Sequence, residues 1–121
     1  MKSHKDLDVW KKSMDLVAEI YRMTRQFPVE EQYGLTSQLR RSAISIPSNI
    51  AEGAGRSSDK EFKQFLSIAL GSAAEVETQL ILAEKLEIRH STSELQSQLA
   101  NIRKMLAGLS SYLSKKNPSK K

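Results

Sequence analysis

The sequence predicts an all-α protein, built as an antiparallel up-down four-helix bundle. Apolar residues recur with helical spacing over four long stretches, and the links between these stretches are short and polar. No segment shows the alternating pattern of a β-strand with comparable strength. A chain of 121 residues allows one domain with one hydrophobic core. We therefore expect a single bundle over residues 1–113, with helices at about 6–26, 35–53, 59–88 and 92–113.

The first helix has two apolar stripes, which lie about 100° apart around its axis. Pro28 ends this helix, because the residue before a proline disfavours the helical region. So wide an apolar surface exceeds what the core of one bundle needs, which favours contacts between subunits. One stripe is Trp10, Met14, Val17, Tyr21 and Thr24, and the other is Val9, Leu16, Ile20, Met23 and Phe27.

The second helix contains a proline in its interior. Pro47 removes a backbone hydrogen bond and clashes with the preceding turn, at a cost of roughly 3 kcal/mol. We expect a kink there, with Asn49 and the neighbouring serines bonding the freed backbone carbonyl groups. The core stripe of this helix consists of Leu39, Ala43, Ile46, Ile50 and Ala54.

The last two helices begin at sequences typical of capping boxes. Ser58 stands three residues before Glu61, and Ser91 stands three residues before Glu94. In this motif the serine side chain bonds a backbone N–H of the first turn, and the glutamate reaches back to the serine. We therefore expect Ser58 to open the third helix and Ser91 to open the fourth.

One carboxylate, Glu77, falls inside the apolar arc of the third helix and should have a cationic partner there. Arg40 and Arg41 of the second helix are the candidates. On this ground we favour a structural role for the arginine pair, within or between subunits, over direct contact with phosphate. The predicted structural polar network comprises Arg40, Arg41, Asn49, Glu52, Glu75 and Glu77.

The composition excludes several classes of protein. The chain has no cysteine, so disulfides, thiolate metal sites and cysteine nucleophiles are excluded. The sequence MKSHKDLDVW lacks the apolar segment of a secretory signal, and no apolar run reaches the roughly 18 residues of a membrane span. We therefore expect a soluble cytoplasmic protein with no membrane contact.

Motifs that carry catalysis or bind metals are missing from the sequence. Glu87–His90 has the E-x-x-H spacing of di-iron bundles, but those sites need a second such motif and two more core carboxylates. Gly53–Gly55 follows a helix and lacks the third glycine of a dinucleotide site. No serine has a histidine or lysine in a motif that would activate it. We predict a non-enzymatic protein that uses no cofactor and no metal.

The net charge of +5 is concentrated at the C-terminus. Residues 1–113 hold 15 basic and 14 acidic side chains, whereas residues 114–121 hold four lysines and no acid. We expect this tail to be disordered and to act mainly as a solubilising end, with a nucleic-acid arm as the alternative. The candidate nucleic-acid contacts are Arg40, Arg41, Arg56, Lys60, Lys63, Lys115 and Lys116.

The stretch Leu39–Arg56, LRRSAISIPSNIAEGAGR, resembles the signature of a bacterial family of four-helix-bundle proteins encoded in intervening sequences of 23S rRNA genes. The similarity covers about residues 5–88 and includes Asp6–Lys11, Tyr33–Thr36 and Glu75–Gln79. It implies a ring-shaped homo-oligomer, commonly a pentamer. The family is also similar to the accessory protein of diversity-generating retroelements, a basic pentamer that engages a reverse transcriptase and nucleic acid.

Two functions follow from the residues and the resemblance. The first is the binding of rRNA, or another structured RNA or DNA, through backbone electrostatics, with an affinity that falls as salt rises. We expect no readout of bases, because the few aromatic residues lie mostly on core stripes. The alternative is a scaffold that holds a partner protein such as a reverse transcriptase, which exposed apolar residues left over after ring assembly would favour.

Overall fold

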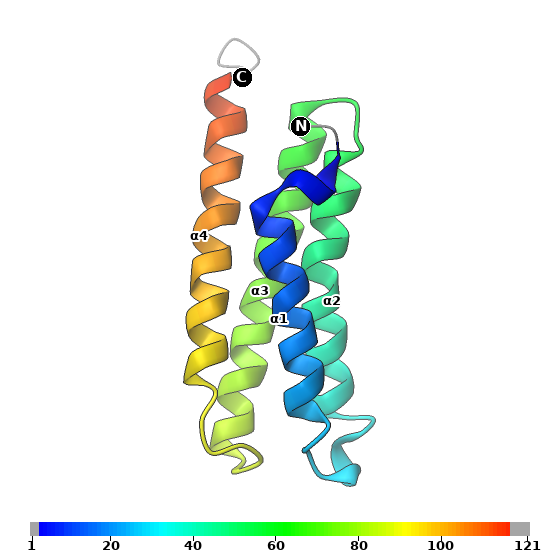
Figure 1. Cartoon of the computed structure of the whole chain (residues 1–121), viewed down its shortest axis with the longest axis vertical. Helices are drawn as coiled ribbons and strands as arrows, with labels where there is room; N and C mark the ends of the chain where they lie inside the picture. Colours follow the sequence, from blue (N-terminus) through cyan, green and yellow to red (C-terminus); the bar gives the residue numbers. More distant parts are fainter. Residues whose placement is uncertain (1–2, 117–121) are drawn as a thin grey trace.

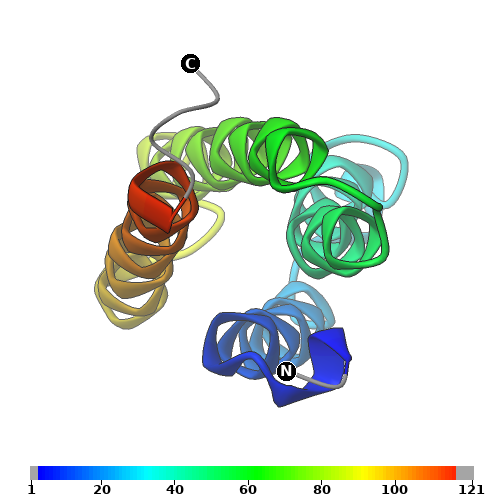
Figure 2. The same cartoon turned by 90° about the horizontal axis from the view of Figure 1, so that it is seen from above.

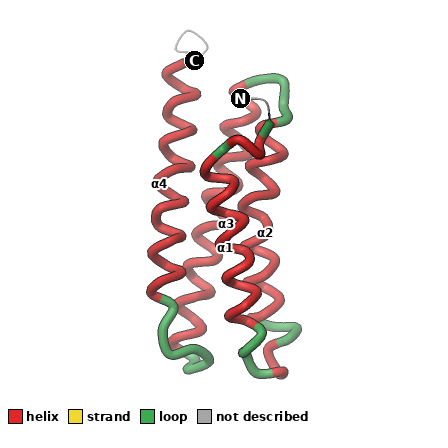
Figure 3. The backbone as a smooth tube through the Cα atoms, in the orientation of Figure 1, coloured by secondary structure: helices red, strands yellow, loops and turns green. Residues whose placement is uncertain are grey.

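The computed structural model describes residues 3–116 and consists of four long helices that run alternately up and down (Figure 1). No strand occurs among these residues (Figure 3). The predicted all-α, antiparallel four-helix bundle is therefore confirmed. The helices are α1 (Asp8–Thr24), α2 (Leu35–Ala54), α3 (Asp59–Lys85) and α4 (Ser93–Lys116), with short 3₁₀ turns at His4–Asp6 and Val29–Glu31.

Seen along the bundle axis, the four helices follow one another around a common core (Figure 2). The contact of α2 with α3 is the most extensive, and that of α1 with α4 is the least extensive of the four neighbouring pairs. One predicted stripe of α1 and most of the predicted stripe of α2 are buried, whereas Met14 on the other stripe of α1 is 45% exposed. The largest fully buried side chains include Leu16, Ile20, Leu39, Ile46, Ile50, Leu66, Leu80, Leu99, Ile102 and Leu106.

Small and polar side chains line the contact between α2 and α3. Gly53 lies against Phe65, and a Cβ atom on this glycine would stand only 2.7 Å from the Phe65 Cβ. Further along the contact, the hydroxyl groups of Ser45 and Ser72 are 2.8 Å apart. The two helices can approach closely because these side chains are small and their polar atoms are paired.

Helix α2 continues through Pro47, whose ring is buried in the core. Asn49 Nδ2 donates to the backbone carbonyl of Ser45 at 2.8 Å, whereas the carbonyl that Pro47 leaves without its helical donor is that of Ala43. Burial of the proline among apolar residues offsets part of the backbone cost. The extent of a kink at Pro47 stays a prediction.

The ends of α3 and α4 differ from the predicted bounds. Helix α3 ends at Lys85 instead of residue 88, because Glu87 adopts a left-handed φ of 59° and the N–H groups of Ile88 and Arg89 both donate to the carbonyl of Ala83. Helix α4 continues through residues 114–116, so the expected disordered tail is wrong for these three residues. The remainder of the predicted tail, 117–121, lies outside the described residues.

Ser58 caps α3 as predicted, since its hydroxyl accepts the Glu61 N–H at 3.2 Å. The capping box predicted for α4 is wrong, because Ser91 Oγ accepts the N–H of Ser93 and makes no hydrogen bond to Glu94. The start of α4 is tied to α3 instead. The backbone N–H and the hydroxyl of Thr92 both donate to Glu84 Oε2 at 2.7 Å.

The contacts with Thr92 change the acidity of Glu84. The hydrogen bond from the Thr92 hydroxyl, followed by the one from its backbone N–H, holds the pKa of the Glu84 carboxyl below its ordinary range. Partial desolvation opposes this effect, and the nearby His90 adds to it. The α3–α4 turn is therefore held by an ionised carboxylate.

The outer side of α3 carries exposed apolar side chains next to exposed polar ones such as Glu75. Ile68, Ile81 and Leu82 of α3 are exposed by 51%, 39% and 40%, and Leu86, which follows the helix, is exposed by 58%. By length and composition α3 could cross a membrane. Its most apolar stretch of 18 residues has a mean hydropathy of 1.3, and 33% of that stretch is buried. A core helix of a soluble bundle passes the same test, and α3 packs on both α2 and α4.

Candidate nucleic-acid interface

The structure divides the predicted cationic contacts between two regions of the bundle. Five of them lie at the end of the bundle that holds the α2–α3 link (Figure 1). Three are at or near the start of α3, namely Arg56, Lys60 and Lys63, and two are at the end of α4, namely Lys115 and Lys116. We call these five residues the end cluster. Arg40 and Arg41 lie in the first half of α2, away from the end cluster, and are called the arginine pair.

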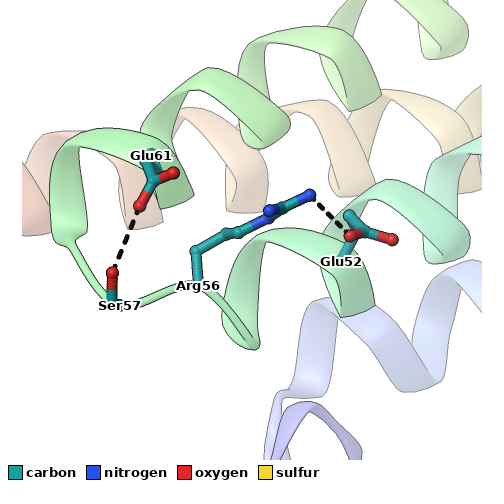
Figure 4. Close-up of polar contacts among 4 residues, drawn as sticks. All are labelled: Glu52, Arg56, Ser57 and Glu61. Atoms are coloured by element: carbon teal, nitrogen blue, oxygen red, sulfur yellow. Dashed lines mark hydrogen bonds and ion pairs between the residues drawn. The ribbon is translucent and has the colours of Figure 1, made fainter.

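Arg56 of the end cluster is bound to a carboxylate of its own chain. Its Nη2 atom lies 2.7 Å from Glu52 Oε2 (Figure 4). Its guanidinium also lies 4.8 Å from the centre of the Phe65 ring. In the same link, Ser57 donates to Glu61 at 3.4 Å. The positive charge of Arg56 is therefore largely offset before any partner arrives.

Two lysines of the end cluster also have partners within the chain. Lys116 Nζ lies 3.7 Å from Asp59 Oδ2, and Lys63 Nζ donates to Ser114 Oγ at 3.0 Å. These contacts join the start of α3 to the end of α4. Lys60 and Lys115 are exposed, and no hydrogen bond or ion pair of theirs occurs among the described residues.

Glu77 does have a cationic partner, as its position in the sequence predicts, but the partner is Arg103 of α4. Arg103 Nη1 donates to Glu77 Oε1 at 2.9 Å, and both side chains are about half-exposed. The expectation that Arg40 or Arg41 supplies this cation is wrong within one chain, because Glu77 lies on the side of α3 that faces α4. Arg103 follows the core residue Ile102, which was the signal in the sequence that could have identified it.

The rest of the predicted polar network does not form within the described chain. No hydrogen bond or ion pair joins any two of its six members, and Glu75 is exposed without a partner. Contacts between these residues across subunits stay a prediction. The bonds observed are Asn49 to Ser45, Glu52 to Arg56, Arg40 to Thr24 and Glu77 to Arg103.

Arg40 is held in place by neutral groups of α1. Its guanidinium stacks on Tyr21 at 4.4 Å from the ring centre, and its Nε donates to Thr24 Oγ1 at 2.9 Å. The Thr24 hydroxyl itself donates to the carbonyl of Ile20 at 2.7 Å, which fixes the acceptor. The side chain is thus ordered while its charge stays without a counterion. Arg41, next along the chain, is exposed and has no hydrogen bond or ion pair among the described residues.

The arginine pair borders a surface hollow of about 510 Å³ that contains no carboxylate. The two hollows along the α1–α4 groove both include Glu19, and the one beside Gly55 includes Glu52. The arginine hollow therefore favours anions more than these three do. It is lined by Tyr21, Gln32, Tyr33, Thr36, Ser37, Arg40, Arg41 and Ile44.

Two tyrosines of this hollow were not among the predicted site residues. Tyr21 lies on an apolar stripe of α1, and its position in the sequence does not indicate that an arginine would stack on it. Tyr33 is 90% exposed in the link before α2. An aromatic residue in a polar link, away from every core stripe, is the signal that could have drawn attention to it.

Comparisons with known proteins agree with this architecture. The model of the family described as 23S rRNA-intervening sequence protein matches residues 5–108. A similar solved structure is the crystal structure of a protein of unknown function from the S23 ribosomal protein family of Bacteroides thetaiotaomicron VPI-5482. That protein is 29% identical, with a TM-score of 0.60, and the match covers 88% of this chain and 95% of that chain.

A comparison with curated proteins finds no match. The relation to retroelement accessory proteins stays a prediction, whereas the resemblance drawn from Leu39–Arg56 is confirmed by the family match, which spans α1 to α3 and most of α4. The chain belongs to the 23S rRNA-intervening sequence protein family.

Proposed function

We propose that this protein is a non-enzymatic, oligomeric nucleic-acid-binding protein that holds the phosphate backbone of rRNA or another structured RNA or DNA. The observation that carries the proposal is the hollow beside Arg40 and Arg41, with two cations and no carboxylate. Because Glu77 is paired with Arg103, neither arginine of the pair is needed to neutralise it.

Assembly would multiply this weak but unneutralised site. Exposed apolar side chains on and beside α3 support a contact with a second copy of the chain, namely Ile68, Ile81 and Leu82 of the helix and Leu86 just after it. In the pentameric ring that the resemblance implies, each arginine hollow would recur five times. When several such sites bind one nucleic acid, the overall affinity rises without any new contact. If the target is a cytoplasmic RNA, the protein acts in the cytoplasm.

Filter binding with a structured 23S rRNA fragment tests the proposal. Each phosphate contact releases counterions, so the affinity should fall steeply between about 50 and 200 mM salt. Light scattering on the same sample gives the mass, which should be a multiple of 13.6 kDa. Absence of binding at the lower salt concentration would rule out the nucleic-acid function whatever the mass.

A protein-interaction scaffold is the second candidate, and the same exposed side chains favour it. If the chain is monomeric in solution, three large apolar side chains of α3 and the neighbouring Leu86 remain exposed, and a partner such as a reverse transcriptase would bury them. Two results together would establish the scaffold instead. The unmodified chain would bind a partner protein but no RNA, and changing both Ile68 and Leu82 to Glu would abolish binding of that partner.

A further inference from the structure

The arginine hollow has an aromatic edge that electrostatic binding alone does not need. We infer that the Tyr33 ring stacks on an unpaired base while Arg40 and Arg41 hold the adjoining phosphates, so that the hollow binds a single-stranded segment of nucleic acid. This inference rests on the proposed function and specifies the part of the nucleic acid that is bound. It changes the expectation of purely backbone contact, which assumed that the aromatic residues lie on core stripes.

Tyr33 is suited to stacking because its ring is exposed and its backbone is anchored. The side chain is 90% exposed and makes no hydrogen bond or ring contact with any described residue. On either side of it, the Gln32 N–H donates to the carbonyl of Val29 at 3.0 Å, and the Gly34 N–H donates to the carbonyl of Glu31 at 3.0 Å. The ring is therefore presented to solvent from a fixed turn.

Arg40 is suited to phosphate because it is already ordered. A guanidinium has five N–H donors, and here Nε is bound to Thr24 while Nη2 makes a longer contact of 3.5 Å with the Tyr21 carbonyl. The remaining donors are available to a ligand. Since the stack on Tyr21 has fixed the side chain in advance, binding costs less conformational entropy than it would for a free arginine.

The remaining lining residues agree with a nucleotide as the ligand. Gln32 and Ser37 offer neutral hydrogen-bonding groups, and Arg41 adds a second cation without a counterion. Glu31, in the turn before α2, accepts the Leu35 N–H at 3.1 Å and so caps α2. The hollow of about 510 Å³ falls within the size range of small-molecule sites.

The aromatic ring selects a single strand over a duplex. In a double helix both faces of each base are covered by its neighbours, whereas an unpaired base offers its face to an aromatic side chain. Stacking of this kind tolerates any base, because every base has a π-face. A second copy of the chain could also cover Tyr33, and the experiment below distinguishes that outcome.

Fluorescence anisotropy should compare a labelled single-stranded RNA, the same sequence as a blunt duplex, and the corresponding single-stranded DNA. Tyr33→Ala should weaken binding of both single strands by roughly 5- to 150-fold and leave the duplex affinity unchanged. Tyr33→Phe should retain single-strand binding. Tyr112→Ala is the matched control, because Tyr112 is a 59% exposed tyrosine on α4, outside the hollow.

Light scattering of each variant completes the test. An equal effect of Tyr33→Ala on single strand and duplex, or no effect on either, overturns the inference but leaves the proposed function intact. A drop in assembly mass that accompanies the loss of binding assigns Tyr33 to a subunit contact and also overturns it. Absence of binding by the unmodified protein to all three probes overturns the proposed function itself.

Discussion

Arg40 of the arginine pair and two cations of the end cluster, Arg56 and Lys116, differ in what holds them. Arg56 and Lys116 of the end cluster lie against carboxylates, so their charges are offset within the chain. Arg40 is held by the hydroxyl of Thr24 and the ring of Tyr21, which order the guanidinium without neutralising it. A cation anchored by neutral groups remains available to an external anion, and this availability cannot be judged from a count of basic residues.

Reversal of the arginine pair should have the largest effect on binding. Arg40→Glu combined with Arg41→Glu removes two charge-assisted contacts, each worth about 1.5–3 kcal/mol, and adds repulsion, so RNA affinity should fall by about 100-fold or more. Filter binding at low salt measures this change. The melting temperature should fall only modestly, because the variant loses the Arg40 contacts with Tyr21 and Thr24, and the assembly mass should not change.

A loss of the fold or of the assembly in this double variant would contradict the assignment. It would show that the arginine pair has the structural role that its position in the sequence favours, through contacts across subunits. The salt dependence gives an independent check, since the loss of two phosphate contacts to a single strand should lower the slope of log K against log salt by about 1.4.

Removal of Arg56 should have a smaller effect. Arg56→Ala takes away a cation but also frees Glu52, which pairs with it at 2.7 Å. Because Glu52 offsets the charge of Arg56 in the folded chain, we expect RNA affinity to change less than it does on reversal of the arginine pair, in the same filter-binding assay. If Arg56→Ala weakens binding as much as Arg41→Ala does, the distinction between the two regions is wrong.

Glu84 is the acidic counterpart of Arg40, because Thr92 holds its charge with neutral donors. The pKa of the Glu84 carboxyl is lower in the folded state than in the unfolded state. Ionised Glu84 therefore stabilises the fold fully at pH values above its unfolded-state pKa of about 4.3. This stabilisation is lost as the pH falls through the lower folded-state pKa. Glu84→Gln should therefore flatten the acid side of the stability profile, measured as the urea midpoint against pH. This is the smallest of the expected effects.

Glu75→Gln is the matched control for this experiment, because Glu75 lies exposed on the same helix and has no partner among the described residues. Its acid-side profile should follow that of the unmodified protein. A profile for Glu84→Gln that also matches the unmodified protein would show that the Thr92 contacts do not stabilise the fold.

Periodicity in the sequence predicts which face of each helix is buried but does not say which neighbouring helix covers a given edge. The core stripes of all four helices were predictable for this reason, and so was the need of Glu77 for a cation. The identity of that cation depended on the order of the helices around the core. This order places α4 beside Glu77, whereas Ser42 and Ser45 of α2 contact another side of α3.

Properties that depend on tertiary contacts were not predictable from composition. The lysines within residues 114–116 indicated a disordered tail in the sequence. In the structure α4 extends through residues 114–116, where Leu113 is buried and Lys116 pairs with Asp59. The exposure of Tyr33 likewise depends on how the link before α2 turns. The hollow itself combines residues of α1, the link and α2, and no single stretch of sequence contains it.

The close packing of α2 on α3 also bears on the order in which the chain folds. These two helices are joined by a short link and share the most extensive contact in the bundle. Contacts between segments that are near in sequence cost little loop-closure entropy, so this helical hairpin is the expected folding nucleus. Substitutions there, such as Gly53→Ala against Phe65, should slow folding, whereas changes on α4 should mainly speed unfolding.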